Sequence, residues 1–262
     1  MEFENFIREV HREFGLNLGG YKEKQLKRRI DSLMLTQGIG SYEDYLKVMI
    51  ENGDQRSKFF DKVTINVSEF FRNPEIFANL ERVILPDLAG GVKKLKIWSA
   101  ACSNGAEPYS IAIILEEMTP KVSYRITATD IDTNILNVAK EGKYDFRALR
   151  NVTPERLSRF FEQTGDGRYS VSPQARKNVT FKKHDLLEEA YDTDYDLIVC
   201  RNVTIYFTRE TQERIYSNFY RSLKDGGVLF IGATENIIQY RQLGFEKVSH
   251  WFYRKGTSGK KG

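Results

Sequence analysis

The chain has 262 residues, of which 40% are hydrophobic and 13% aromatic, so it can bury the core of one large domain with a small one attached. Its 40 lysines and arginines exceed its 36 carboxylates by four, a mild excess that gives no argument for nucleic acid as a partner. Cys102 and Cys200 belong to no Cys-x-x-Cys pair, which disfavours a disulfide framework and a zinc site, and we expect no metal. No apolar run approaches the roughly 18 residues that span a bilayer, and the acidic N-terminus lacks a signal-peptide pattern. The sequence therefore predicts a cytoplasmic protein without membrane insertion.

The first 62 residues have a helical pattern. Phe6 and Val10 recur at helical spacing in a first segment, and Leu26 and Ile30 do so in a second. A third helix is expected from Ser41, whose hydroxyl forms a capping box with the acid three residues later, until Asn52-Gly53-Asp54 ends it. We therefore expect a small helical domain over residues 1–62, followed by a linker and helix over residues 63–90.

From residue 95 on, apolar strands alternate with helical segments. Strands are expected at residues 95–100, 125–129, 179–183, 196–200, 227–232 and 246–254. This alternation predicts an α/β fold with a mainly parallel sheet, helices on both faces and an antiparallel edge strand at the end. The expected domain covers residues 91–255, with a small β-hairpin insertion near residues 163–178 and a disordered tail at residues 256–262.

The turn after the first strand is typical of a nucleotide-binding βαβ unit. The segment from Leu95 to Ser110 runs from an apolar strand through small residues into a helix, and the second strand ends at Asp130. A carboxylate at that place can accept both hydroxyls of a ribose. A purely structural turn remains an alternative, and Asp130 or Asp132 could instead cap the helix that follows.

The same turn disfavours a dinucleotide. It has one glycine, Gly105, where a pyrophosphate-binding loop has three, and Glu107 stands at the start of the helix. An acid there suits a cationic or uncharged ligand. S-adenosylmethionine fits, since it carries adenosine, an ammonium group and a sulfonium but no phosphate.

Three further segments carry polar residues among apolar ones. These are NVSEFFR at residues 66–72, CRNVTIYF at residues 200–207 and GGVLFIGATE at residues 226–235. The second is a buried strand whose end presents Arg201, Asn202 and Tyr206, and ligands of open α/β sheets bind beyond such strand ends. We therefore expect these side chains at the pocket.

Together with AACSNGAEPYS at residues 100–110 and ATDID at residues 128–132, these segments resemble the motifs of the CheR family, in the same order and over nearly the whole chain. The resemblance implies a class I, Rossmann-like methyltransferase with a seven-stranded sheet, a helical N-terminal domain and a β insertion. It implies a protein-glutamate O-methyltransferase that converts S-adenosylmethionine to S-adenosylhomocysteine and methylates the cytoplasmic domains of chemoreceptors (methyl-accepting chemotaxis proteins). We expect a monomer, since nothing demands a dimer.

The resemblance also implies site residues. Arg72 and Tyr206 correspond to the side chains beside the reaction centre, and Glu107 and Asp130 to the acids for the methionine end and the ribose. The remaining cofactor contacts implied are Asn66, Ser68, Asp185, Leu186, Arg201 and Asn202, with Arg72 again among them. Two positions depart from the family pattern, Asn104 in place of threonine and Ala106 in place of an acid, which leaves the cofactor affinity open.

A basic cluster marks the start of the second helix. Lys24, Lys27, Arg28 and Arg29, with Lys22, are opposed only by Glu23, and family receptors carry acidic helices, so we expect this cluster to dock the substrate. A merely solvated face is the alternative. Three rival functions are a nucleic-acid methyltransferase, a non-catalytic S-adenosylmethionine sensor and a nicotinamide dehydrogenase. The first would commonly carry prolines after the fourth strand, where this chain has none, and the last is disfavoured by the single glycine.

Overall fold

The computed structural model describes residues 1–64, 66 and 68–256, and the chain divides into two compact units. The first unit comprises Met1–Asn66, Asp185–Glu189 and Tyr206–Ile215, and the second comprises Val67–His184, Ala190–Ile205 and Tyr216–Gly262. The tail predicted to be disordered falls, apart from residue 256, outside the described residues. The domain limits expected from the sequence stay predictions.

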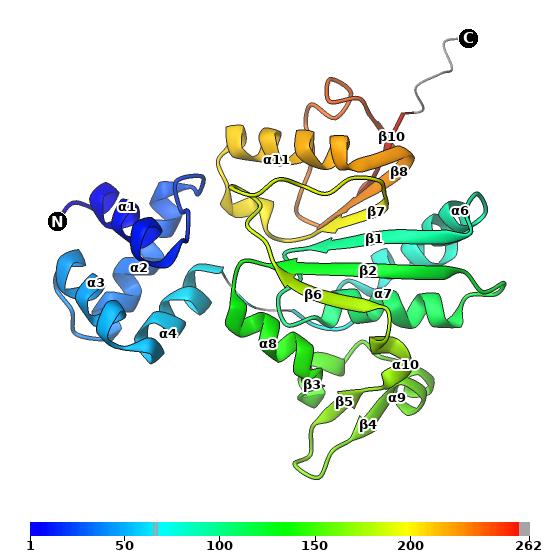
Figure 1. Cartoon of the computed structure of the whole chain (residues 1–262), viewed down its shortest axis with the longest axis horizontal. Helices are drawn as coiled ribbons and strands as arrows, with labels where there is room; N and C mark the ends of the chain where they lie inside the picture. Colours follow the sequence, from blue (N-terminus) through cyan, green and yellow to red (C-terminus); the bar gives the residue numbers. More distant parts are fainter. Residues whose placement is uncertain (65, 67, 257–262) are drawn as a thin grey trace. The chain divides into compact units, whose positions relative to one another are not determined.

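Four helices form the body of the first unit (Figure 1): α1 (Phe3–Phe14), α2 (Glu23–Thr36), α3 (Tyr42–Glu51) and α4 (Gly53–Thr64). Their apolar faces meet around Phe6, whose ring lies 6.2 Å from the rings of both Tyr45 and Phe59. All three side chains are fully buried, so the unit has an aromatic core of its own.

The sequence predicts three of these helices and misses α4. Ser41 caps α3 as expected, since its hydroxyl accepts from the Asp44 N–H at 3.1 Å. Asn52, taken as a stop signal, also begins the next helix: its Oδ1 accepts from the N–H groups of Asp54 and Gln55 at 3.0 and 3.2 Å. One residue thus ends α3 and caps α4.

A seven-stranded sheet forms the second unit, in the order β6-β2-β1-β7-β8-β10-β9. Its strands are β1 (Lys94–Ala100), β2 (Ser123–Asp130), β6 (Val179–Lys183), β7 (Tyr195–Cys200), β8 (Leu223–Ile231), β9 (Phe245–Lys247) and β10 (Phe252–Lys255). The strands from β6 to β8 pair in parallel, whereas β10 is antiparallel to both of its neighbours. The predicted Rossmann-like sheet with an antiparallel edge is confirmed.

The last predicted strand is wrong in one respect. Residues 246–254 are not one strand but the hairpin of β9 and β10, in which the Val248 N–H donates to the Phe252 carbonyl at 2.9 Å. Only β10 pairs with β8, and β9 lies outside it. The alternating pattern continued through the turn and concealed it.

Helices accompany the strands of the second unit. They are α5 (Pro74–Asn79), the π-helical turn η1 (Leu80–Ile84), α6 (Leu85–Ala89), α7 (Ala106–Glu117), α8 (Thr133–Glu141) and α11 (Arg209–Ser222), the last of which runs through both units. Residues 106–116 of α7 are all buried, which explains its lack of a polar face. Among the described residues, no helix is both long enough and apolar enough to cross a membrane.

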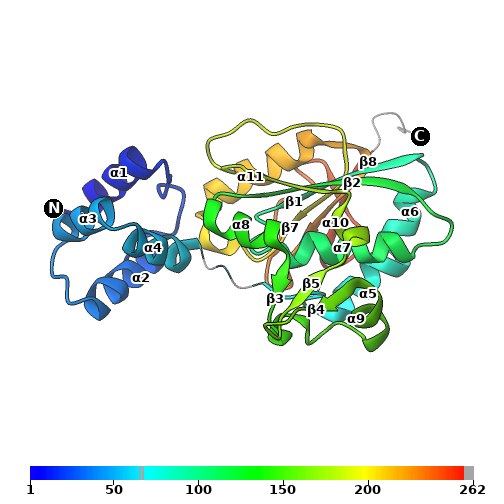
Figure 2. The same cartoon turned by 60° about the horizontal axis from the view of Figure 1, so that its bottom comes forward.

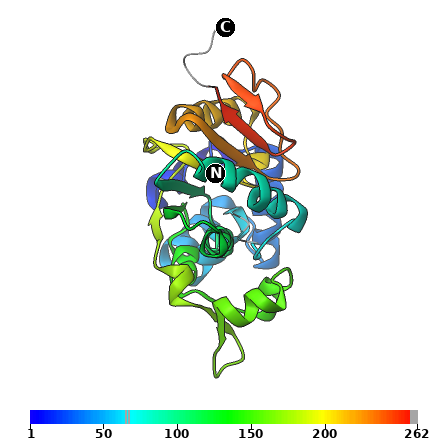
Figure 3. The ribbon, with the colours of Figure 1, turned by 90° about the vertical axis from the view of Figure 1, so that its right-hand side faces the viewer.

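The predicted insertion is a small three-stranded sheet in the order β3-β5-β4. Its elements are β3 (Lys143–Tyr144), the 3₁₀ turn η2 (Phe146–Leu149), α9 (Pro154–Phe160), β4 (Phe161–Gln163), β5 (Tyr169–Val171) and α10 (Pro173–Arg176). Figures 2 and 3 show α9 beside this sheet and the β4–β5 turn projecting away from the main sheet. The hairpin was expected, but β3, which precedes it by seventeen residues, was not.

Candidate active site

The candidate site lies in the loops that follow β1, β2, β7 and β8, at the carboxyl ends of these strands. The loop after β1 is sharply bent, with positive φ at Ala101, Ser103 and Gly105. A Cβ on Gly105 would lie 2.9 Å from the Cβ of Ala139, so only glycine fits the start of α7 without displacing α8. The bend aims the first turn of α7 at the ends of the neighbouring strands.

Glu107 lies in that first turn and is buried. Its Oε1 accepts a hydrogen bond from the Ser99 hydroxyl at 2.8 Å, and its Oε2 lies 3.6 Å from Nη1 of Arg201. Burial raises the pKa of Glu107, while Arg201 and Ser99 oppose the rise. Glu107 is therefore a buried carboxylate that already has one cationic partner and one hydroxyl donor.

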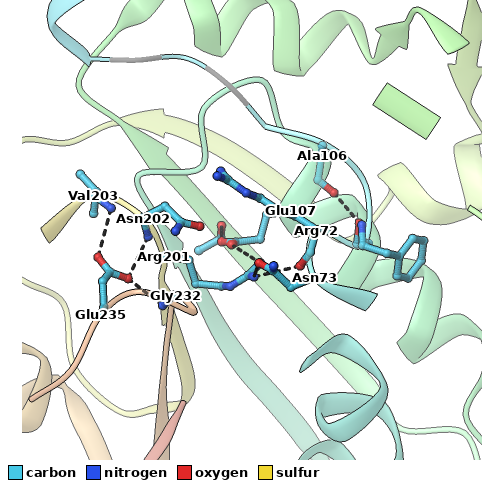
Figure 4. Close-up of polar contacts among 12 residues, drawn as sticks. Arg72, Asn73, Ala106, Glu107, Arg201, Asn202, Val203, Gly232 and Glu235 are labelled. Atoms are coloured by element: carbon cyan, nitrogen blue, oxygen red, sulfur yellow. Dashed lines mark hydrogen bonds and ion pairs between the residues drawn. The ribbon is translucent and has the colours of Figure 1, made fainter. Parts of the chain in front are cut away.

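Arg201 follows β7 directly and connects two parts of the site (Figure 4). Its Nη2 donates to the Arg72 carbonyl at 2.9 Å and to Oδ1 of Asn73 at 3.0 Å. The guanidinium carbon also lies against the rings of Phe77 and Phe230, at 5.2 and 4.8 Å from their centroids. Burial lowers the pKa of Arg201, and Glu107 is the main group that offsets this effect.

The turn held by Arg201 is strained. Phe71 and Asn73, on either side of Arg72, have φ values of 50° and 62°. A left-handed conformation costs a non-glycine residue about 1–2 kcal/mol, so contacts elsewhere must impose it. Arg201 supplies one of these contacts, and Arg72 therefore sits on a fixed turn.

Asp130 ends β2 and is 6% exposed. Its Oδ2 accepts from the Ser103 N–H at 2.8 Å and its Oδ1 from the Asp132 N–H at 3.1 Å. Burial raises the pKa of Asp130 to about 6, although these backbone hydrogen bonds lower it in part. The helix-cap alternative is settled, because Asp132 is the residue that caps α8, through the N–H groups of Asn134 and Ile135.

The loop after β7 is held by Glu235, from the loop after β8. Its Oε2 accepts from the N–H groups of Asn202 and Gly232 at 2.8 and 2.6 Å, and its Oε1 from that of Val203 at 3.2 Å (Figure 4). The same Oε1 accepts from the Thr204 N–H at 2.9 Å. Asn202 has a φ of 61°, another left-handed residue that needs such support. Glu235 received no role from the sequence, although it is the last residue of the quoted segment GGVLFIGATE.

Asn104, one of the two departures from the family pattern, has a structural place. Its Oδ1 accepts from the Ala106 N–H at 3.1 Å, and its Nδ2 donates to the Ser68 carbonyl at 3.2 Å. The amide thus supports the start of α7 and joins it to the backbone of Ser68. Ala106, the other departure, is fully buried, and its carbonyl accepts from the Ser110 hydroxyl at 2.7 Å. A small apolar side chain suits this position.

Four predicted site residues belong to the first unit: Asn66, Asp185, Leu186 and Tyr206. Asp185 is buried, and its Oδ1 accepts from the Leu187 N–H at 2.7 Å. The ring of Tyr206 lies 4.4 Å from the guanidinium carbon of Arg29 on α2. That these residues share a pocket with Glu107 stays a prediction.

The basic cluster of α2 is not uniform. Lys24 and Arg28 are exposed, but Nζ of Lys27 donates to Oδ2 of Asp31 at 2.9 Å and to the Tyr42 hydroxyl at 2.7 Å. These bonds, that of Tyr42 first, raise the pKa of Lys27 to about 12. Part of the predicted docking cluster is therefore bound within its own unit.

The second unit carries polar groups that suit an adenosine ligand with a positive charge and no phosphate. The carboxylate of Asp130 accepts hydrogen bonds from the N–H groups of Ser103 and Asp132, and each oxygen has a second lone pair that a hydroxyl could use. The Ser103 hydroxyl is buried and has no hydrogen-bond partner within the described part of the chain. Glu107 and Asp130 are buried carboxylates, which accept hydrogen bonds from hydroxyl and ammonium groups and offer no donor to a phosphate.

Comparisons with known proteins agree with this arrangement. The family model described as "CheR methyltransferase, SAM binding domain" matches residues 66–252, and "CheR methyltransferase, all-alpha domain" matches residues 1–64. A "Chemotaxis protein methyltransferase" of Listeria monocytogenes is 40% identical over 251 residues, 95% of each chain. "Chemotaxis protein methyltransferase 1" of Pseudomonas aeruginosa is 37% identical over 245 residues, 89% of each chain. The chain therefore belongs to the CheR family of methyltransferases, and S-adenosylmethionine is its cofactor.

Proposed function

We propose that this methyltransferase esterifies glutamate side chains on the cytoplasmic helices of chemoreceptors, and that it acts as a cytoplasmic monomer. The names of its relatives support the chemotactic role. The observation that supports the chemistry is the turn of Arg72, whose carbonyl accepts a hydrogen bond from Arg201, which in turn lies beside the buried Glu107. A guanidinium carried on such a turn suits a substrate that arrives as a carboxylate.

A glutamate carboxylate meets this requirement. Its reference pKa is about 4.3, so it is a nucleophile at neutral pH without a general base. S-adenosylmethionine supplies an activated methyl group, and the protein has to align and desolvate the carboxylate. We propose that the guanidinium of Arg72 orients this carboxylate, because it can bind both oxygens. The Tyr206 hydroxyl is proposed beside the reacting atoms.

The other proposed roles follow from position. Glu107 binds the ammonium group of the methionine end, and Asp130 binds the ribose hydroxyls. Further contacts are proposed for Asn66, Ser68, Asp185, Leu186, Arg201 and Asn202. For Arg201 and Asn202 we assign the contact to the strand-end backbone, since the Arg201 side chain already contacts Glu107, Arg72 and Asn73.

One assay tests the chemistry. The chain is incubated with methyl-labelled S-adenosylmethionine and a receptor cytoplasmic fragment, and the product is treated with base. Release of the label as methanol is expected, since a methyl ester is base-labile. A base-stable label would instead indicate N-methylation, and no incorporation would indicate a binding protein.

A second assay tests the docking surface on α2. Lys24 and Arg28 are exposed, so their replacement by Glu leaves the internal bonds of Lys27 intact. This double variant is expected to raise the KM for the receptor at low salt and to leave S-adenosylhomocysteine affinity unchanged. The control of equal charge change is Lys58→Glu with Lys62→Glu, two exposed positions on α4. Equal receptor KM values for the two proteins would contradict docking on α2.

A further inference from the structure

The turn that carries Arg72 depends on its neighbours. Phe71 and Asn73 both have left-handed backbones, which L-residues keep only where the surrounding structure imposes them. Arg201 holds the carbonyl of Arg72 and the side chain of Asn73. Arg201 does not contact Phe71 through these bonds, so other groups must hold the left-handed backbone at Phe71.

Phe71 is 3% exposed and is held by three groups. Its N–H donates to the Ser110 hydroxyl at 3.0 Å, and its ring meets the Phe77 ring edge-on with centroids 5.6 Å apart. The guanidinium carbon of Arg156 lies 4.7 Å from the Phe71 ring centroid. Of these three groups, Arg156 is the only charged one, and it lies on α9 beside the small sheet.

Arg156 is itself firmly fixed. Its Nε donates to Oε2 of Glu117 at 2.8 Å, and its Nη2 donates to Oε1 of Glu81 at 2.7 Å. Burial alone would lower the pKa of Arg156, but the hydrogen bonds to Glu81 and Glu117 outweigh it and raise that pKa. The planar cation therefore stays charged and keeps a fixed orientation over the ring.

The residue before Phe71 belongs to the small sheet. The Phe70 N–H donates to the Ala148 carbonyl at 2.9 Å. The Phe70 ring packs edge-on against Tyr144 of β3 and Phe161 of β4, with centroids 4.8 and 5.0 Å away. Two consecutive residues before Arg72 are thus held by residues 144–161, which lie in and beside the small sheet and precede the insertion expected near residues 163–178.

We propose that Arg156 is a positioning residue for methyl transfer: by stacking on Phe71 it holds the turn that presents Arg72. The proposal rests on the proposed function, because it takes the part of Arg72 in the reaction from there. The contacts of Arg156 are to Glu81, Glu117 and Phe71, so it has no proposed contact with cofactor or substrate. Its effect reaches the reaction through the backbone of residues 71–73.

The test compares two arginines of one helix. Arg156→Met removes the group over Phe71, whereas Arg159→Met removes a guanidinium that lies 4.9 Å from the centroid of the Phe160 ring. Arg156→Lys is the variant expected to fold, since it keeps a cation between Glu81 and Glu117. We expect kcat to fall about 10- to 100-fold in Arg156→Met and less in Arg156→Lys, with the receptor KM nearly unchanged. Arg159→Met is expected to keep the wild-type kcat.

A double-variant cycle separates positioning from simple destabilisation. If Arg156 acts through Arg72, Arg156→Met should reduce kcat little further in an Arg72→Lys background. Equal losses in both backgrounds, or a kcat for Arg156→Met and Arg156→Lys within about twofold of wild type, would overturn the proposal. All rates are taken per folded enzyme, from urea titrations of each variant.

Hydrogen exchange gives a measurement that does not need activity. The Phe71 amide should exchange faster in Arg156→Met than in Arg159→Met, relative to the wild type. A wild-type chain that methylates no receptor would refute the proposed function, and the exchange rates would still decide whether Arg156 holds the turn. Unchanged Phe71 exchange in Arg156→Met would refute the positioning role itself.

Discussion

We predict that Asp130 makes cofactor affinity depend on pH. Burial raises its pKa to about 6 in the free protein. The ribose hydroxyls proposed to bind it would donate to the carboxylate, and such donors favour the charged form. Binding should therefore lower the pKa of Asp130 and release a proton. The sign follows: affinity is highest above pH 6 and is lost as the pH falls through that value.

The magnitude follows from the two pKa values. If the bound form returns to an ordinary pKa near 4, affinity for S-adenosylhomocysteine should fall about tenfold between pH 7.5 and pH 5, or about 1.4 kcal/mol. Isothermal calorimetry on the full chain measures this directly. Repeating it in buffers of different ionisation enthalpy gives the number of protons released.

Asp130→Asn is the control for this titration. The amide cannot ionise, so the variant should bind about 10- to 100-fold more weakly and lose most of the pH dependence. A slope that remains belongs to Glu107, whose pKa is also raised by burial. A wild-type affinity that is flat from pH 7.5 to pH 5, or an undiminished slope in Asp130→Asn, would refute the reasoning.

Three further predictions concern stability and are measured by urea unfolding. Arg201→Met leaves Glu107 buried without its cation and should lower the free energy of unfolding by about 3–5 kcal/mol. Adding Glu107→Gln should recover part of this loss, whereas additive losses in the double variant would argue against a coupled pair. Both carboxylate oxygens of Glu235 accept from backbone N–H groups, so the NH₂ group of Glu235→Gln would face a donor in either orientation. This change should lower the free energy of unfolding by at least about 2 kcal/mol, and an unchanged unfolding midpoint would show that these bonds contribute little. Gly105→Ala combines a φ of 86° with a 2.9 Å contact to Ala139 and should cost at least about 1–2 kcal/mol, whereas Gly91→Ala, with nothing within 4 Å, should cost less than about 1 kcal/mol.

The main sheet was accessible from the sequence because its parallel strands are continuous apolar runs, each followed by polar residues. Strand ends of such a sheet share one edge, so Asp130 and Arg201 could be placed at the same edge from their positions alone. The pairing of Arg201 with Glu107 and with the Arg72 carbonyl could not be predicted. Those groups lie far apart along the chain, and only the packed structure fixes their distances.

The errors have local causes. Asn52 serves as both stop and start, so the helix α4 that it begins was overlooked. The turn between β9 and β10 keeps the alternation of a strand, which hid the hairpin. Lys27 bonds to Asp31 on its own helix and to Tyr42, fifteen residues further along the chain. A count of charges in the sequence does not show these bonds, so the whole basic cluster was expected to be available for docking.

The carboxylate of Glu235 has a consequence for how the enzyme meets its ligand. Glu235 joins the loop after β7 to the loop after β8. The backbone amides of residues 202–204 and 232 should therefore exchange their hydrogens through one cooperative opening, with the same opening free energy. This edge of the sheet is thus shaped before any molecule arrives. The loops after β7 and β8 should therefore lose little conformational entropy when a ligand binds. Any entropy cost of ordering the protein on binding should come from other segments.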